Sequence, residues 1–115
     1  MIIRVYRCTV VAGKEAEFRA FAVSKSHPWL RERPGLIAFY AGRPLPESGE
    51  RTRCMVQVWE SVSAMQAAIG EDWRQPPNLP DEARAFIESA SVEHYELADE
   101  HHAPNMEGRA PVTLG

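Results

Sequence analysis

Two neighbouring segments, residues 35–44 and 51–60, are apolar on both sides, and they constrain the fold more than any other feature. They read GLIAFYAGRP and RTRCMVQVWE, and each is interrupted by few residues that disfavour strands. Successive side chains of a strand point to opposite faces of a sheet, so a strand that is apolar on both sides needs cover on both sides. Leu36, Ala38 and Tyr40 are predicted to face one way, with Ile37, Phe39 and Ala41 facing the other.

The rest of the chain supplies two further strands and several helices. Residues 2–11 (IIRVYRCTVV) and 91–97 (SVEHYEL) are typical of strands. Phe18, Phe21 and Ala22 fall at helical spacing, which predicts an amphipathic helix from residue 14 to residue 26. Two more helices are expected, the first capped by Ser61 and ended by Gly70, over residues 61–70 and 81–90.

Pro28 is expected to interrupt the first helix. It has no N–H to donate to Ser24, and its ring crowds that carbonyl group. The residue before a proline also avoids helical geometry, so His27 should leave it. The sequence therefore predicts a kink or break at His27–Pro28, followed by a short turn through residues 29–33.

The resulting order, β-α-β-β-α-(α)-β, predicts an α+β, ferredoxin-like antiparallel sheet with strand order 4-1-3-2 and helices on one face. The helices cover only that face, and no other segment is available for the second one. A second copy of the chain, packed sheet to sheet across a two-fold axis, is the economical cover. The sequence thus predicts a homodimer.

Composition narrows the class of protein. A chain of 115 residues suggests one domain, and a net charge of −3 without any basic stripe argues against nucleic-acid binding. No apolar run approaches 18 residues, so neither a membrane span nor a signal peptide is expected, and the cytoplasm is the default location. Cys8 and Cys54 fit no metal motif and should be reduced, as small buried side chains or, less commonly, in a redox role.

The chain divides into a domain over residues 1–98 and an extension over residues 99–115. The extension has no periodicity, so it is expected to be irregular and either disordered or docked on the partner subunit. His101 and His102 form a weak metal signal without a third ligand, and no metal is expected. The sequence also lacks a glycine-rich phosphate loop and a nucleophile elbow.

Five stretches of residues 1–98 together resemble the antibiotic biosynthesis monooxygenase family of the dimeric α+β barrel superfamily. They are MIIRVYRCTVVAGKEAEF, RPGLIAFYAGRP, VQVWES, GEDW and VEHYE, in this order. The resemblance implies a homodimer whose two sheets form a barrel, with a pocket between sheet and helices in each subunit. Some members oxidise phenolic or anthrone-type polyketides, or quinols, with O2 and no flavin or metal. Others degrade haem, and others have no known activity.

His94 is the candidate base for such chemistry. A cofactor-free oxygenase must deprotonate its substrate, stabilise the oxyanion and position both reactants in an apolar cavity. A histidine near its usual pKa of about 6.5 suits the first task. Alternation places His94 and Tyr95 on opposite faces, so only one can face the pocket. A structural role for His94 remains the alternative, and Glu93 and Glu96 are expected to pair with Arg4 or Arg7.

Five further residues are candidates for substrate binding, each with a structural alternative. Trp73 can close the pocket or fill the core, while Tyr40 and Trp59 can stack on a flat ligand or pack in the core or dimer. His27 can border the pocket or lie in an exposed loop. Arg43 can anchor a carboxylate or phenolate of the substrate, or form a salt bridge.

Three functions remain open. The first is a cofactor-independent monooxygenase acting on a small aromatic substrate with O2. The second is a dimer that binds a small apolar ligand without turnover. The third is haem handling, which the resemblance links to an asparagine on the first strand; residues 2–11 have none, because the only asparagines are Asn78 and Asn105.

Overall fold

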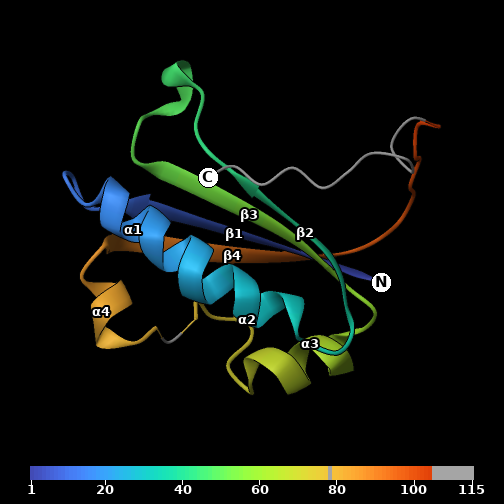
Figure 1. Ribbon diagram of the computed structural model, residues 1–115. Coiled ribbons are helices and arrows are strands. Elements are labelled where there is room, and N and C mark those ends of the chain that lie inside the picture. Colours follow the sequence, from blue (N-terminus) through green and yellow to red (C-terminus); the bar gives the residue numbers. More distant parts are fainter. Residues whose placement is uncertain (78, 105–115) are drawn as a thin grey trace.

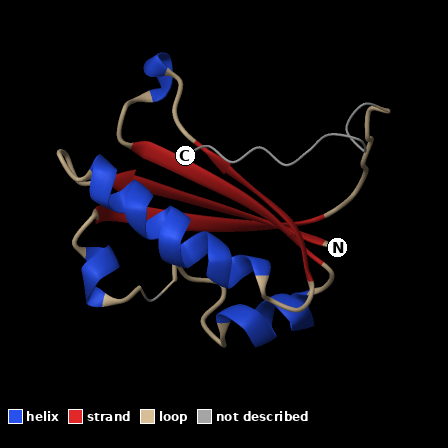
Figure 2. Ribbon diagram, in the orientation of Figure 1, coloured by secondary structure: helices blue, strands red, loops and turns tan. Residues whose placement is uncertain are grey.

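A four-stranded antiparallel sheet forms the centre of the molecule. The computed structural model describes residues 1–77 and 79–104, and the four α-helices of that part lie on one face of the sheet (Figures 1 and 2). The strand order is β2-β3-β1-β4, which confirms the predicted ferredoxin-like plan. The strands are β1 Ile2–Val10, β2 Leu36–Gly42, β3 Thr52–Trp59 and β4 Ile87–Glu96.

Strand β2 contains an irregularity that changes which side chains share a face. Leu36 pairs with Trp59, Phe39 with Gln57 and Ala41 with Met55, and the register shifts between Leu36 and Ala38. An extra residue at such a shift reverses the alternation. Leu36 therefore shares the helix-covered face with Phe39 and Ala41, and the prediction that groups it with Ala38 and Tyr40 is wrong.

The first helical region runs continuously across the sheet (Figure 1). It comprises α1 Glu15–Phe21, a π-helical turn Ala22–Ser26 and α2 His27–Arg31. His27 keeps helical dihedrals, φ −65° and ψ −44°, and its N–H donates to the carbonyl of Ala22. The predicted break is wrong because the π turn changes the hydrogen-bond register, which makes Pro28 a first-turn residue of a new segment, where proline is tolerated.

Helix α3 Val62–Ile69 confirms the expected caps. The Ser61 hydroxyl oxygen accepts from the N–H of Ala64 at 3.1 Å, and Gly70 ends the helix with a φ of 113°. Gly35 lets this helix approach the sheet, since a Cβ there would lie 2.5 Å from the Cβ of Ala64. A 3-10 turn, Pro46–Ser48, lies in the β2–β3 connection.

Helix α4 is shorter than predicted. It spans Asp81–Arg84, and residues 87–90 belong instead to β4, where Ile87 pairs with Val10 of β1. Pairing with a distant strand overrides the local helical pattern here, because β1 offers a complete ladder of hydrogen-bond partners. The predicted helix over residues 81–90 is therefore wrong in its second half.

The core lies between the sheet and the helices. Its buried members come from β1, α2, β3, α3 and the loop after α3: Ile2, Leu30, Trp59, Met65 and Trp73. The other face of the sheet stays open within the single chain, with Ile37, Tyr40 and Tyr95 at 50%, 62% and 51% exposure. This open face is the one for which the sequence predicts a partner.

The predicted extension is only partly described. Residues 99–104 form no helix or strand, and residues 105–115 lie outside the described residues. Within the described ranges, no helix has both the length and the apolar character that a membrane crossing requires.

Candidate functional site

A cavity of about 820 Å³ lies between the sheet and the helical region α1–α2. Its walls come from β1, β2, β3, the first helical region, the end of α3 and the segment around α4. Much of the lining is apolar, including Phe18, Phe21, Leu30, Met55, Ile69 and Leu79. A concave, mostly apolar space with a few polar groups is the usual form of a small-molecule site.

Arg4 is the main charged group at the base of this cavity. It is only 2% exposed, and its Nη1 donates to the carbonyl of Trp73 at 2.5 Å and to Nε2 of His94 at 2.8 Å. Among the described residues, no acidic side chain forms an ion pair with it, and burial lowers its pKa from the usual value. A buried cation without an anion is energetically costly, so an anionic ligand would compensate it.

His94 faces the helices but does not line the cavity. It lies opposite Arg4 in the β1–β4 ladder, and its ring packs edge-on against Trp73 with centroids 4.8 Å apart. Burial lowers the pKa of His94, and the charges of Arg4 and Arg74 lower it further. The imidazole is therefore neutral near pH 7, and its Nε2 lone pair accepts a hydrogen bond from Arg4.

His27 does line the cavity. It is the first residue of α2, and its ring lies 5.3 Å from that of Phe39, measured between centroids. Burial lowers the pKa of His27, and the nearby charge of Arg31 lowers it further. The structure thus presents a neutral imidazole to the cavity, which is a group that can accept a proton.

Tyr6 and Gln57 also line the cavity, and the sequence analysis did not single them out. Burial, with a smaller effect of Cys8, raises the pKa of Tyr6, so its hydroxyl remains a donor. The Gln57 Oε1 accepts from Trp59 Nε1 at 2.9 Å. A signal for Tyr6 exists in the sequence: Ile2, Arg4, Tyr6 and Cys8 are every second residue of one strand and so share a face, on which Arg4 and Tyr6 are the polar positions.

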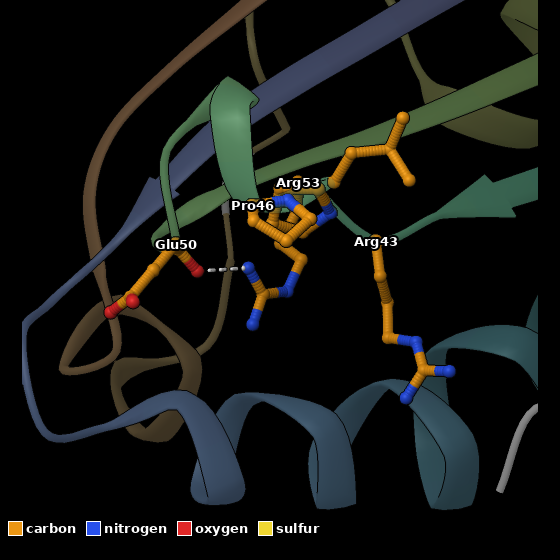
Figure 3. Close-up of a pocket in the computed structure, with 6 residues that line it drawn as sticks. Arg43, Pro46, Glu50 and Arg53 are labelled. Carbon is orange, nitrogen blue, oxygen red and sulfur yellow. Dashed lines mark hydrogen bonds between the residues drawn. The ribbon is translucent and has the colours of Figure 1, made fainter.

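The predicted substrate-binding residues are not all at the cavity. His27 and Arg43 line it, whereas Trp59 and Trp73 belong to the hydrophobic core. Arg43 also borders a second hollow of about 400 Å³, together with Arg53 (Figure 3). Tyr40 lies on the open face of the sheet, because its partner in the ladder is Val56 rather than a residue of the helix-covered face.

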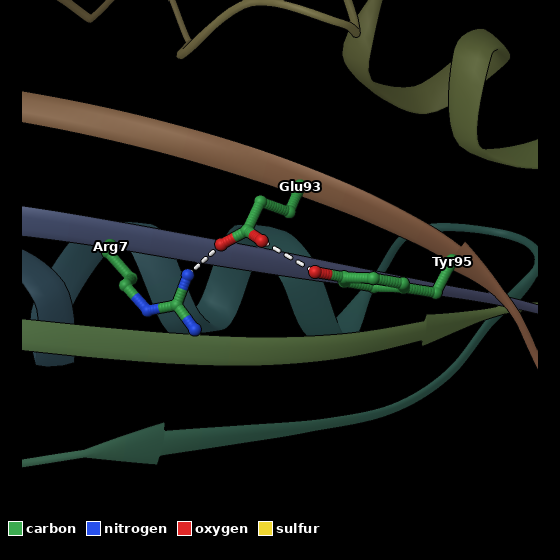
Figure 4. Close-up of polar contacts among 3 residues, drawn as sticks. All are labelled: Arg7, Glu93 and Tyr95. Carbon is green, nitrogen blue, oxygen red and sulfur yellow. Dashed lines mark hydrogen bonds and ion pairs between the residues drawn. The ribbon is translucent and has the colours of Figure 1, made fainter.

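The open face carries a network of its own (Figure 4). Arg7 forms an ion pair with Glu93, and the Tyr95 hydroxyl donates to the second Glu93 oxygen at 2.5 Å. The expected pairing of Glu93 with an arginine of the first strand is confirmed. His94 and Tyr95 lie opposite Arg4 and Ile3 of β1, so they point to different faces, as alternation predicts.

Cys8 and Cys54 are free thiols, and burial raises the pKa of Cys8. A thiol held in its protonated form is a weak nucleophile. In the described ranges, no cluster of three or more histidine, cysteine or acidic side chains has an arrangement that suits a metal ion.

Comparison with solved structures identifies the class of fold. SnoaB, a cofactor-independent oxygenase from Streptomyces nogalater, is 17% identical with a TM-score of 0.66, and the match covers 86% of this chain and 94% of SnoaB. A Deinococcus radiodurans protein provisionally assigned as an antibiotic biosynthesis monooxygenase is 16% identical with a TM-score of 0.66, over 90% of this chain and 98% of that one. This chain therefore has the ferredoxin-like fold of the antibiotic biosynthesis monooxygenases.

A second kind of protein shares the fold. An MhuD variant with two manganese protoporphyrin IX molecules bound per active site is 21% identical with a TM-score of 0.67, covering 90% of this chain and all of MhuD. No protein-family model matches the sequence, and no curated protein matches it either. At these identities the likeness shows the architecture alone.

Proposed function

We propose that this protein is a cofactor-independent monooxygenase that oxidises a small phenolic, quinol or anthrone-like compound with O2. The observation that carries the proposal is a buried cation without an acidic partner, Arg4, at an apolar cavity that also presents a neutral histidine and a tyrosine hydroxyl. A substrate anion is the reactive species in such chemistry, and the site is suited to form and hold one. The shared fold with SnoaB supports this reading.

The chemistry needs a base, an oxyanion site and access to O2. His27 accepts the substrate proton, and the resulting oxyanion lies against Arg4 and Tyr6. The electron-rich carbanion form then transfers an electron to O2, and the two radicals combine into a peroxide anion at carbon. This anion takes back the proton held by His27 and becomes a hydroperoxide. Loss of water leaves a carbonyl. For an anthrone, a CH2 group and one O2 become a C=O group and one H2O, so atoms and electrons balance.

His94 acts through Arg4 in this proposal. Its Nε2 accepts from the guanidinium, so the ring proton resides on Nδ1, and the contact helps to fix the direction of the Arg4 side chain. The sequence alone favours His94 as the base. In the proposed mechanism His27 takes that role because it lines the cavity, and His94 becomes a positioning residue.

A second copy of the chain would cover the open face. Ile37 and Tyr40 are at least half exposed there, and they belong to β2, a strand whose sequence is apolar on both sides. An exposed apolar surface of this kind is the usual sign of an interface. The homodimer is therefore part of the proposal.

The test of the proposed reaction uses purified, metal-free protein and anthrone in air. Anthraquinone formation is followed by absorbance, and ¹⁸O2 shows whether one oxygen atom enters the product. We expect His27→Gln to lower kcat by about 100-fold or more, the range for loss of a general base. His94→Gln should lower kcat. The dependence of kcat on pH that the titration of His27 produces should remain measurable in this variant. No acceleration over buffer by the unaltered protein would remove the monooxygenase reading.

Haem binding is the second candidate, and one observation favours it. His27 is a neutral imidazole at a cavity large enough for a flat macrocycle, and Arg43 and Arg53 lie on the same wall, where propionates would find cations. Bound haem would supply O2 chemistry of its own. The absence of asparagine from residues 2–11 argues against the haem degradation that the family resemblance links to such an asparagine. Titration with haem decides the question, since coordination by His27 would shift the Soret band and His27→Gln would abolish the shift.

A further inference from the structure

The cavity is electrically unlike the rest of the chain. The protein as a whole has a net charge of −3. The charged side chains that line the cavity are nevertheless five basic and two acidic: Arg4, Arg19, Lys25, Arg43 and Arg53 against Glu15 and Glu82. Lys25 and Glu82 neutralise each other across 2.7 Å, so the remaining excess is positive.

Arg43 stands out within this excess. It follows directly after β2, borders both the main cavity and the second hollow, and is exposed. Among the described residues it has no ion pair and no side-chain hydrogen bond. In Figure 3 its side chain extends from the sheet toward the helical region that forms the opposite wall. Its five donors are therefore available to a ligand.

Arg53 lies beside it on the neighbouring strand and is held more firmly. Its Nη1 donates to the carbonyl oxygens of Glu50 and Thr52, each at 2.9 Å, and its guanidinium lies 5.9 Å from the Phe18 ring centroid. The Glu50 carboxylate, the acidic group that borders the second hollow, points away from both arginines in Figure 3. The wall therefore has one oriented and one free guanidinium group without an acidic partner.

We infer that the natural substrate is an aromatic carboxylic acid whose carboxylate is bound by Arg43, with Arg53 contributing to the local positive potential. This inference rests on the proposed function and names its substrate class. A planar guanidinium binds a carboxylate by two parallel hydrogen bonds, which a neutral ligand cannot match. The aromatic rings occupy the apolar part of the cavity, and the reacting oxygen lies at Arg4.

The spacing of Arg4 and Arg43 sets the shape of this ligand. Arg43 lies four positions beyond Phe39 along β2, and Phe39 is connected to Arg4 across β3 through Gln57. Strand geometry separates their Cα atoms by about 13 Å along the strands and about 10 Å across them. Both side chains are long and reach inward, so the gap between them suits fused rings with an acid at one end, rather than a single small ring.

The experiment compares two ligands that share a ring system and differ in charge. Anthraquinone-2-carboxylate and anthraquinone-2-carboxamide do not react with O2, so calorimetric titration measures binding without turnover. We expect the unaltered protein to bind the carboxylate about tenfold more tightly than the carboxamide, as one charge-assisted contact allows. The preference should weaken in 0.5 M salt because part of it is electrostatic.

The variants make the result specific to the site. Arg43→Gln should bring the ratio of affinities close to one, and Arg43→Lys should retain part of it. Arg84→Gln removes the same charge from an exposed position that does not line the cavity, and should leave the ratio unchanged. Equal affinities in the unaltered protein would overturn the inference while leaving the proposed oxidation intact. Failure of the proposed oxidation would appear separately, as an intact affinity ratio without turnover of anthrone.

Discussion

Strand β1 places one arginine on each face of the sheet, and the two are satisfied in different ways. Arg7, on the open face, pairs with Glu93, whose other oxygen accepts from Tyr95 (Figure 4). Arg4, on the helix-covered face, contacts an imidazole and a carbonyl and forms no ion pair among the described residues. The positive charge is thus neutralised within the chain on the open face, whereas on the helix-covered face it has no acidic partner among the described residues.

Stability alone does not explain a buried arginine without an acidic partner. An exposed ion pair such as Arg7–Glu93 contributes roughly 0–1 kcal/mol. A buried, unpaired charge is destabilising, and replacing one with an apolar residue of similar size is often neutral or stabilising. A buried Arg4 without an acidic partner is therefore what the proposed reaction requires, whereas the proposal gives Arg7 no part in the reaction.

The largest expected effect concerns the core on the helix-covered face. Trp59 has no exposed surface, and its Nε1 donates to Gln57. Trp59→Ala should lower the free energy of unfolding by about 3–5 kcal/mol, because it leaves a cavity and an unpaired buried amide oxygen. Urea denaturation measures the loss. Trp29→Ala, at a tryptophan that is 45% exposed, is the matched control and should cost much less; similar losses would contradict the placement of Trp59.

The next prediction tests the two arginines directly. Arg4→Met should reduce kcat on anthrone by about 100-fold, as expected for loss of an oxyanion contact. The variant also loses the hydrogen bonds to the Trp73 carbonyl and to His94, so its free energy of unfolding is measured alongside. Arg7→Met removes the same charge from the same strand and should leave kcat within about twofold, since exposed pairs contribute little. Steady-state kinetics and urea denaturation on both variants separate the roles. Equal loss of activity in the two variants would break the contrast between the faces.

The oligomeric state of the protein tests the role of the open face. We expect the unaltered protein to sediment as a dimer at micromolar concentration, and Tyr40→Arg to sediment as a monomer, since a buried unpaired charge opposes association. Trp29→Arg, an equivalent change on the helical side, should leave the dimer unchanged. Sedimentation equilibrium gives the masses, and a monomeric unaltered protein would leave the open face without its proposed cover.

The smallest effect is a dependence of stability on pH. Folding lowers the pKa of both His27 and His94 below the usual 6.5, chiefly by burial. Between the folded and unfolded pKa values the unfolded chain binds more protons, so stability is complete above about pH 6.5 and falls as the pH drops through the folded values. Urea midpoints at pH 7.5 and 5.5 measure this.

The control for that dependence is a pair of substitutions. The double variant His27→Gln, His94→Gln should show a smaller difference between the two pH values, whereas His101→Gln, at an exposed position, should not change it. An unchanged slope in the double variant would show that other groups cause the loss of stability.

Local pattern was sufficient for much of the fold. The strand order, the Ser61 cap and the Gly70 end follow from apolar alternation, capping chemistry and the order of elements. Pattern failed where distant contacts or unusual geometry intervened. Pairing with β1 converted residues 87–90 from helix to strand, a register shift regrouped Leu36, and a π turn accommodated Pro28.

The candidate site was less predictable than the fold. Alternation was enough to separate His94 from Tyr95 and to expect Glu93 beside an arginine of the first strand.

The sequence alone determined that this chain forms an antiparallel sheet with helices on one face and apolar residues on both, because alternation and helical spacing are local properties. Only the tertiary structure decided that His27 rather than His94 lines the cavity, and that Arg4 is buried without an acidic partner. Those facts depend on which distant side chains meet, and neighbours in sequence do not specify that.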